Sequence, residues 1–181
     1  MSAIISGEIL FKFSVAAAAG NTTPGTAPTS LGDQISTSAW TGSVANDLFD
    51  DISGAENAAS TVDYRCIFVH NSNASNALEN AVVYLSAETA GGAGIAVAAD
   101  STAASAVASG STQALTVANE TTAPAGPLTF SSPTSAGAGV ALGNIPAGQC
   151  KAFWIRRTAA NSLALSADGV TIAVTGDTGS L

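Results

Sequence analysis

The feature that most limits how this chain can fold is a series of short runs in which apolar and polar residues alternate. Gly, Pro, Asn, Ser and Thr separate these runs, and helical spacing of apolar residues is hard to find. Alternation gives a strand two different faces, and many short strands divided by turn residues are typical of a sandwich or barrel. The sequence therefore predicts an all-β protein, an antiparallel β-sandwich of seven to nine strands.

Two stretches are expected to form the central strands, because their alternation is the most regular. In residues 63–71 it separates two faces, Tyr64, Cys66, Phe68 and His70 on one and Arg65, Ile67 and Val69 on the other. In residues 150–158 it separates Lys151, Phe153, Ile155 and Arg157 from Ala152, Trp154 and Arg156. A further strand at 79–87 follows the first stretch after a polar turn, so we expect these two to pair as antiparallel neighbours.

The remaining strands are expected at 8–15, 95–98, 115–118, 128–130 and 140–145. Pro146-Ala147-Gly148-Gln149 is expected to form a turn, because proline pre-sets its second position and Gly148 can take the left-handed conformation. Residues 163–174 are expected to form a hairpin around Asp168-Gly169, since an Asp-Gly pair between alternating residues favours a two-residue turn. Residues 31–60 are the least regular, with one helical turn expected at Asp47–Asp51.

We expect the first 30 residues to stand apart from the sandwich, which would comprise residues 31–181. Residues 8–15 alternate like a strand, and 16–29 contain Pro24-Gly25 and Pro28, which favours an extended arm. If the strand adds to the sheet of a neighbouring subunit, backbone hydrogen bonds supply much of the binding. Deletion of residues 2–15 is then expected to abolish binding and to leave a folded sandwich.

Charge excludes some classes of partner. The 181 residues include 13 Asp and Glu but only 5 Lys and Arg, a formal net charge of −8. Neutralising phosphates needs clustered Lys and Arg, so we expect no nucleic-acid partner. No run approaches the roughly 20 apolar residues that span a bilayer, so we expect no membrane partner. The first residues lack the basic and apolar regions of an export signal, which predicts synthesis in a cytoplasm.

Catalytic and metal-binding patterns are hard to find. The single histidine, His70, is expected to be a strand-end residue, and Cys66 and Cys150 are expected to be free buried thiols, with one disulfide as the alternative. Two Cys and one His are too scattered for a structural zinc site. No carboxylate pair is singled out for glycoside hydrolysis. We therefore expect no enzyme activity, no metal and no cofactor.

One acidic group has the right oxygen atoms for calcium but the spacing of no calcium-binding loop. It comprises Asp47, Asp50, Asp51 and Glu56. We expect it to be a solvated turn that is anchored in the core by Leu48, Phe49 and Ile52.

Four of the five basic residues fall in the two central strands, namely Arg65, Lys151, Arg156 and Arg157. If these strands are neighbours, the four residues form a small basic face suited to an acidic partner, including a second copy of the chain. The alternative is that they are solvent-facing strand positions paired with nearby acids. The candidate interface consists of these four residues together with Ile9, Phe11 and Phe13 of the first strand.

Several segments resemble small virion proteins of tailed bacteriophages. The most specific are Asp-Tyr-Arg-Cys-Ile-Phe-Val-His-Asn at 63–71 and Phe-Trp-Ile-Arg-Arg-Thr at 153–158. Residues 47–56, 78–85 and 142–149 contribute, so the resemblance spans about 47–158. The Ile-Pro-Ala-Gly-Gln turn that leads into the last strand is also similar to many immunoglobulin-like sandwich domains. The resemblance carries no catalytic residues.

This resemblance implies an immunoglobulin-like or jelly-roll sandwich with a structural role on the virion. The expected function is that of a capsid cement or decoration protein on the outer surface of the head. Its partners would be the major capsid protein and copies of itself, in a homo-oligomer such as a trimer. The alternative is a tail or baseplate accessory protein that binds a host surface glycan or protein, with Trp40 or Tyr84 in an exposed aromatic cluster.

Overall fold

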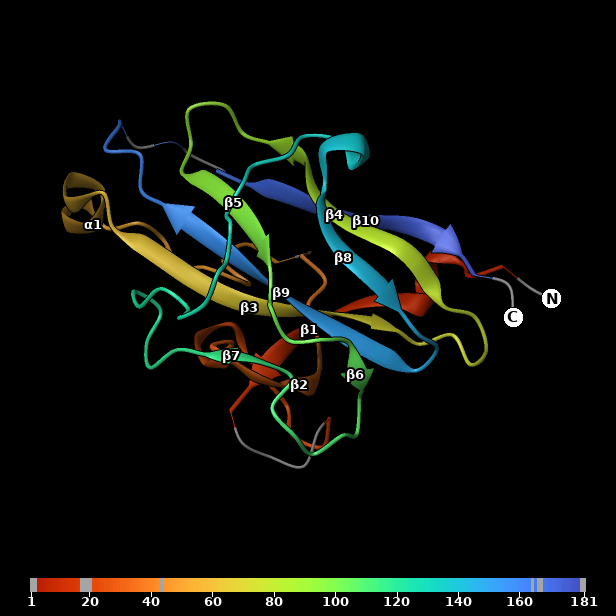
Figure 1. The fold of residues 1–181 in the computed structure, drawn as a ribbon. Helices are drawn as coiled ribbons and strands as arrows, with labels where there is room; N and C mark the ends of the chain where they lie inside the picture. Colours follow the sequence, from red (N-terminus) through yellow and green to blue (C-terminus); the bar gives the residue numbers. More distant parts are fainter. Residues whose placement is uncertain (1–2, 17–20, 43, 164, 166–167, 180–181) are drawn as a thin grey trace.

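The computed structural model describes residues 3–16, 21–42, 44–163, 165 and 168–179. They form two antiparallel sheets packed on each other, with one short α-helix at the edge (Figure 1). The predicted all-β sandwich is therefore confirmed. The described residues contain ten strands rather than seven to nine, because the irregular region contributes a strand at 32–39 and a two-residue strand forms at 105–106.

The elements follow one another along the chain with these bounds. The strands are β1 (Ile9–Val15), β2 (Gly32–Ala39), β3 (Val62–Asn71), β4 (Leu78–Glu88), β5 (Gly94–Ala99), β6 (Ser105–Ala106), β7 (Ala114–Thr116), β8 (Val140–Ile145), β9 (Gln149–Thr158) and β10 (Val170–Thr178). The α-helix is α1 (Gly54–Ala59), and three 3₁₀ turns cover Ser6–Glu8, Ala27–Thr29 and Ala136–Ala138.

The larger sheet has the order β5-β9-β3-β1-β2-β7, with β6 also paired to β9, and the smaller sheet has the order β10-β4-β8. The two central strands predicted from the sequence are direct neighbours. Their ladder runs from Val62 opposite Thr158 to His70 opposite Cys150. In Figure 1 the smaller sheet lies on one side of β3 and β9, and β2 and β7 lie on the other.

Because β3 and β9 have neighbours on both faces, the sandwich contains two apolar cores. The first lies between the sheets and is built from Ile67, Val69, Phe153, Ile155, Val83, Leu85 and Ile172 among others. The second lies on the opposite face and is built from Cys66, Phe68, Trp154, Ile35 and Val117 among others. The predicted separation of faces in both central strands is therefore confirmed.

The expected pairing of 79–87 with 63–71 is wrong, because β3 and β4 belong to different sheets. The polar connection between them crosses from one layer to the other. Buried Asn71 holds this crossing, since its Nδ2 donates to the carbonyls of Asn76 (2.9 Å) and Ile145 (3.0 Å). The Pro146–Gln149 turn also connects strands of different sheets, and Gly148 has the expected positive φ of 68°.

The expected hairpin at 163–174 is present only as its second strand. β10 pairs with β4, with Ile172 opposite Leu85, while Leu163 and Leu165 lie outside any strand. The rest of the expected first strand, residues 164, 166 and 167, lies outside the described residues. Asp168 is used elsewhere, since its carboxylate accepts a 2.7 Å hydrogen bond from the backbone of Ala93.

Two smaller expectations are also corrected. The helical turn lies at α1 instead of Asp47–Asp51, because Ser53 and Glu56 form a capping box in which each side chain accepts from the other residue's backbone N–H. Residues 128–130 form no strand. The neighbouring Ser131 instead makes an isolated bridge to Val97 of β5.

The N-terminal strand is an internal strand of the larger sheet. On one side β1 pairs with β3, placing Phe13 opposite Ile67, and on the other it pairs with β2, placing Ser14 opposite Ile35. Residues 21–30 fold back over β2, where the Asn21 N–H donates to the Ile35 carbonyl. β1 therefore has no free edge for a neighbouring subunit, and the strand-addition hypothesis is not compatible with this pairing.

Candidate functional site

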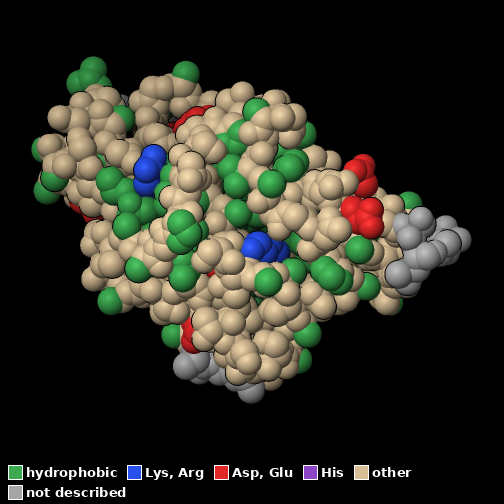
Figure 2. All heavy atoms as spheres, viewed as in Figure 1, with side chains coloured by type: hydrophobic (Ala, Val, Ile, Leu, Met, Phe, Trp, Pro, Cys, Tyr) green, Lys and Arg blue, Asp and Glu red, His purple; other side chains and the backbone are tan. Residues whose placement is uncertain are grey.

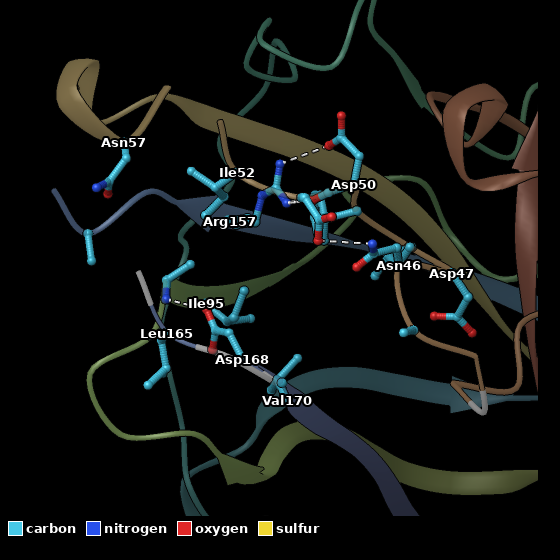
Figure 3. Close-up of a pocket in the computed structure, with 18 of the residues that line it drawn as sticks. Asn46, Asp47, Asp50, Ile52, Asn57, Ile95, Arg157, Leu165, Asp168 and Val170 are labelled. Atoms are coloured by element: carbon cyan, nitrogen blue, oxygen red, sulfur yellow. Dashed lines mark hydrogen bonds and ion pairs between the residues drawn. The ribbon is translucent and has the colours of Figure 1, made fainter. Parts of the chain in front are cut away.

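An open cleft of about 750 Å³ lies at the end of the sandwich where β5, β9 and β10 meet the connecting segments. Trp40, Gly42 and residues 44–54 form one side of it. The other side is formed by residues 91–93 and 168–170 together with Ala160, Ser162, Leu163 and Leu165. Figure 3 shows Asp47 and Asp50 on the first side and Leu165 and Asp168 on the second. Ile95 of β5 and Val170 of β10 also line the cleft, so both sheets contribute to the site.

The first side of the cleft is anchored by apolar residues, as the sequence predicts for Leu48 and Phe49. Leu48 is buried in the core between the sheets, and Phe49 packs against it. The Phe49 ring lies near two guanidinium groups, with its centroid 5.4 Å from Cζ of Arg65 and 4.7 Å from Cζ of Arg157. The acidic segment is therefore held as a fixed wall by cation–π contacts and apolar packing.

Arg157 connects this wall to the central strands. Its Nε and Nη2 donate to Oδ2 of buried Asp63 at 3.1 and 2.7 Å, and Nη2 also reaches Oδ1 of Asp50 at 3.2 Å. Nη1 donates to the Asp50 carbonyl. Arg65 is held in the same manner by the Leu48 carbonyl (3.2 Å) and the carboxylate of Glu120. Both guanidinium groups are thus neutralised by partners that fix the fold.

The cleft is acidic. Four aspartates and one arginine among its described lining residues leave a formal charge of −3. Three of the carboxylates accept a hydrogen bond that holds a loop: Asp47 from Trp40 Nε1 (3.0 Å), Asp51 from Asn46 Nδ2 (3.0 Å) and Asp168 from Ala93 N (2.7 Å). The fourth, Asp50, pairs with Arg157. Each of the four carboxylates therefore has a structural partner, and these contacts assign none of them to a reaction.

The cleft also carries most of the exposed large apolar side chains. Among the described residues four such side chains are exposed, and three of them line the cleft: Val44 (67% exposed), Leu163 (94%) and Leu165 (44%). The fourth, Ile5, lies elsewhere. Because exposed apolar residues grouped within a polar rim mark interaction sites, this grouping makes the cleft the candidate functional site.

The four basic residues predicted as a docking face do not form one. Arg65, Lys151 and Arg157 are buried, and alternation along β9 sends Arg156 to the opposite face from Arg157. There Arg156 lies over the ring of Phe130, 5.1 Å from its centroid. The Lys and Arg atoms visible on the face in Figure 2 accordingly occupy two separate places. The alternative of pairing with acids is confirmed for Arg65 and Arg157, although neither is solvent-facing.

The apolar candidates of the first strand pack into the core. Phe13 belongs to the cluster between the sheets, and Ile9 and Phe11 pack against that cluster. The Phe11 ring makes edge contacts with Trp40 and Phe153, with centroids 5.7 and 6.0 Å apart. These residues stabilise the protein internally, and they connect the core to the Trp40 side of the cleft.

Cys66 and Cys150 are free and buried, as the sequence predicts. His70 lies at the penultimate position of β3, where burial lowers its pKa and the charge of Lys12 lowers it further. In the described part of the chain, no group of three or more His, Cys, Asp or Glu side chains is placed to hold a metal ion.

Sequence reasoning missed the apolar side of the cleft. The predicted hairpin places Leu163 and Leu165 in a strand, and Val44 lies in the irregular region, so the sequence does not mark these residues as exposed. One signal in the sequence could have indicated this exposure. The alternation around Leu163 and Leu165 is short before Asp168-Gly169, which makes a strand there less certain than in the central stretches. In the structure both residues lie outside any strand and are exposed.

Comparison of the chain with protein-family models, curated proteins and solved structures finds no match. Within the described ranges, no helix is long and apolar enough to cross a membrane.

Proposed function

We propose that this protein is a structural component of a bacteriophage virion, a cement or decoration protein on the outer surface of the head. The observation that supports this proposal most directly is that Val44, Leu163 and Leu165, three exposed apolar residues, line one cleft of the sandwich. An exposed apolar group within a polar rim suits a protein partner. The proposal therefore assigns the cleft to subunit contact rather than to a reaction.

The small number of charged residues also supports a protein whose surface makes contacts with neighbouring subunits. Only 10% of the residues are charged, and three of the five basic side chains are buried in internal hydrogen bonds. The cores of protein interfaces are depleted in charged residues. A surface composed mainly of small, uncharged residues is suited to close contact with neighbouring subunits.

The two most specific segments of the bacteriophage resemblance form the centre of the fold. They are β3 and β9, which pair with each other over their full length. These two segments therefore form the scaffold, whereas residues 47–56, which also contribute to the resemblance, lie mainly along the cleft. We assign attachment to the segments at this end of the sandwich. In this mechanism many copies each make a modest interface with the shell, and their number stabilises the lattice.

The test is the copy number of the protein on purified particles, measured by mass spectrometry against the major capsid protein. We expect one copy per capsid subunit or a simple fraction of it. Absence of the protein from particles would contradict the proposal.

A second function, a tail or baseplate accessory that binds a host glycan or protein, is favoured by one observation. Trp40 lines the cleft, and aromatic rings are frequent in sugar-binding sites. Against this, the indole N–H is already donated to Asp47 and the ring packs against Phe11. A ratio of a few copies per hundred capsid subunits would favour this second function, and glycan binding would then be the next measurement.

A further inference from the structure

We infer that the cleft is a docking site for a protein segment that carries Lys or Arg beside a large apolar side chain. This inference rests on the proposed function, because the segment would belong to the major capsid protein. It identifies the surface of this chain that makes the contact and the chemistry of the partner that fits it.

The apolar part of the argument comes from the side of the cleft that contains Leu163, Leu165 and Val170. Leu163 and Leu165 are exposed there, and Val170 and Ile95 continue the apolar surface inward toward the core between the sheets. Covering exposed leucine side chains with an apolar partner is favourable in proportion to the apolar area removed from water. An aliphatic side chain inserted between the two sides would therefore bind by removing these residues from water.

The charged part of the argument comes from the carboxylates around this apolar surface. Asp50, Asp51 and Asp168 are exposed at the cleft, and Figure 3 shows Asp50 and Asp168 reaching it from opposite sides. Arg157, the only cation among the described lining residues, is buried and already paired with Asp63 and Asp50. The acidic excess is thus left for a cationic partner, and complementary charge favours both the rate and the specificity of such binding.

A second copy of this chain does not supply such a segment. Arg65, Lys151 and Arg157 are buried, Lys12 is partly buried and donates to Asn21, and Arg156 lies over Phe130. These five are all the Lys and Arg residues of the sequence. The charge complementarity therefore favours a different protein as the occupant of the cleft.

The test is binding of the full chain to a fluorescent synthetic peptide that contains several lysines and two leucines, measured by anisotropy. Two matched peptides replace the lysines by glutamate or the leucines by serine. We expect saturable binding of the first peptide alone, weakened as salt rises from about 50 to 300 mM. Equal binding of the three peptides, or no binding at millimolar concentration, would overturn the inference.

Variants then locate the binding on the protein. Leu163→Ser is expected to weaken binding about tenfold, because it removes an exposed apolar contact without disturbing the core. Asp51→Asn is expected to weaken it several-fold and to reduce its dependence on salt. The matched controls are Ile5→Ser and Asp177→Asn, which alter an exposed apolar residue and an exposed carboxylate outside the cleft. Equal effects of the cleft variants and the controls would contradict the inference.

Measurements on particles separate this inference from the proposed function. If the wild-type protein is present on particles and Leu163→Ser remains at the same copy number, the cleft is not the docking site but the virion function stands. If the peptide binds as expected but the wild-type protein is absent from particles, the docking chemistry stands and the virion function fails.

Discussion

The carboxylate of Asp100 accepts a 2.8 Å hydrogen bond from Nε1 of Trp154, and both side chains are buried. The same Oδ2 accepts from the backbone N–H of Leu115 at 2.9 Å, and Oδ1 accepts from that of Thr102 at 2.8 Å. Lys151 Nζ donates to the Asp100 carbonyl at 2.7 Å. Asp100 therefore holds the Ala/Ser-rich middle of the chain against the second core. This part of the chain contains few large apolar residues that could hold it there by packing.

Replacement of Asp100 by asparagine tests this fastening. One of the donors would face an amide N–H₂ group in place of a carboxylate oxygen, so we expect the free energy of unfolding to fall by about 2–3 kcal/mol. Urea unfolding followed by tryptophan fluorescence measures the change. Asp177→Asn is the control, because this exposed carboxylate should change stability by less than about 0.5 kcal/mol. Equal losses in both variants would contradict the role of Asp100.

The buried ion pair of Arg157 and Asp63 gives a second prediction. Arg157→Met leaves the carboxylate of Asp63 buried without its cation, which is expected to lower the free energy of unfolding by about 3–5 kcal/mol. The double variant Arg157→Met with Asp63→Leu should recover part of that loss, because the unpaired charge is then absent. Chemical unfolding of the wild type, the two single variants Arg157→Met and Asp63→Leu, and the double variant measures this coupling. Simple addition of the two single losses would show that the pair does not act as a unit.

The position of β1 reverses the expectation for an N-terminal deletion. Without residues 2–15 the larger sheet loses an internal strand and the core between the sheets loses Phe13. We expect the deleted protein to be unfolded or aggregated, as seen by circular dichroism and gel filtration. A shorter deletion of residues 2–5 retains β1 and should fold. A folded sandwich after the longer deletion would contradict the pairing described here.

His70 should make stability depend on pH near neutrality. Burial lowers its pKa in the folded protein, and Lys12 lowers it further, whereas the unfolded chain has the ordinary value of 6.5. As the pH falls below 6.5 the unfolded chain binds the proton first, so the folded protein loses stability until the pH reaches the lowered pKa. Urea unfolding between pH 7.5 and 5.5 should show this loss, and His70→Gln should reduce it. An unchanged slope in the variant would exclude His70 as the source.

The two thiols are expected to be unreactive in the folded protein. Burial raises the pKa of Cys66 well above its ordinary value and raises that of Cys150 to about 12. Since the thiolate is the reactive form, a thiol reagent at pH 8 should label neither residue until denaturant is added. Rapid labelling of native protein would mean that the second core opens readily.

Much of the local structure could be predicted from the sequence. Alternation assigned the faces of β3 and β9 correctly, because successive side chains of a strand point to opposite faces of the sheet. Alternate residues of both strands therefore enter different cores. The turn at Pro146–Gln149 was predicted for a similar reason, since Pro146 and Gly148 restrict the backbone locally. The predicted anchoring of the acidic segment was correct for Leu48 and Phe49, whereas Ile52 belongs to neither core.

Sequence alone determined that this protein is an all-β sandwich with buried cysteines and a strong acidic balance, because these properties follow from residue type and short-range spacing. Tertiary structure decided that β4 pairs with β10 and that β1 lies inside the sheet. It also decided that Arg65 and Arg157 are buried and that Leu163 and Leu165 are exposed at a cleft that contains four carboxylates. Alternation specifies which side chains face a core, but strand partners depend on contacts between residues far apart in the chain, and the cleft exists only once those partners are chosen.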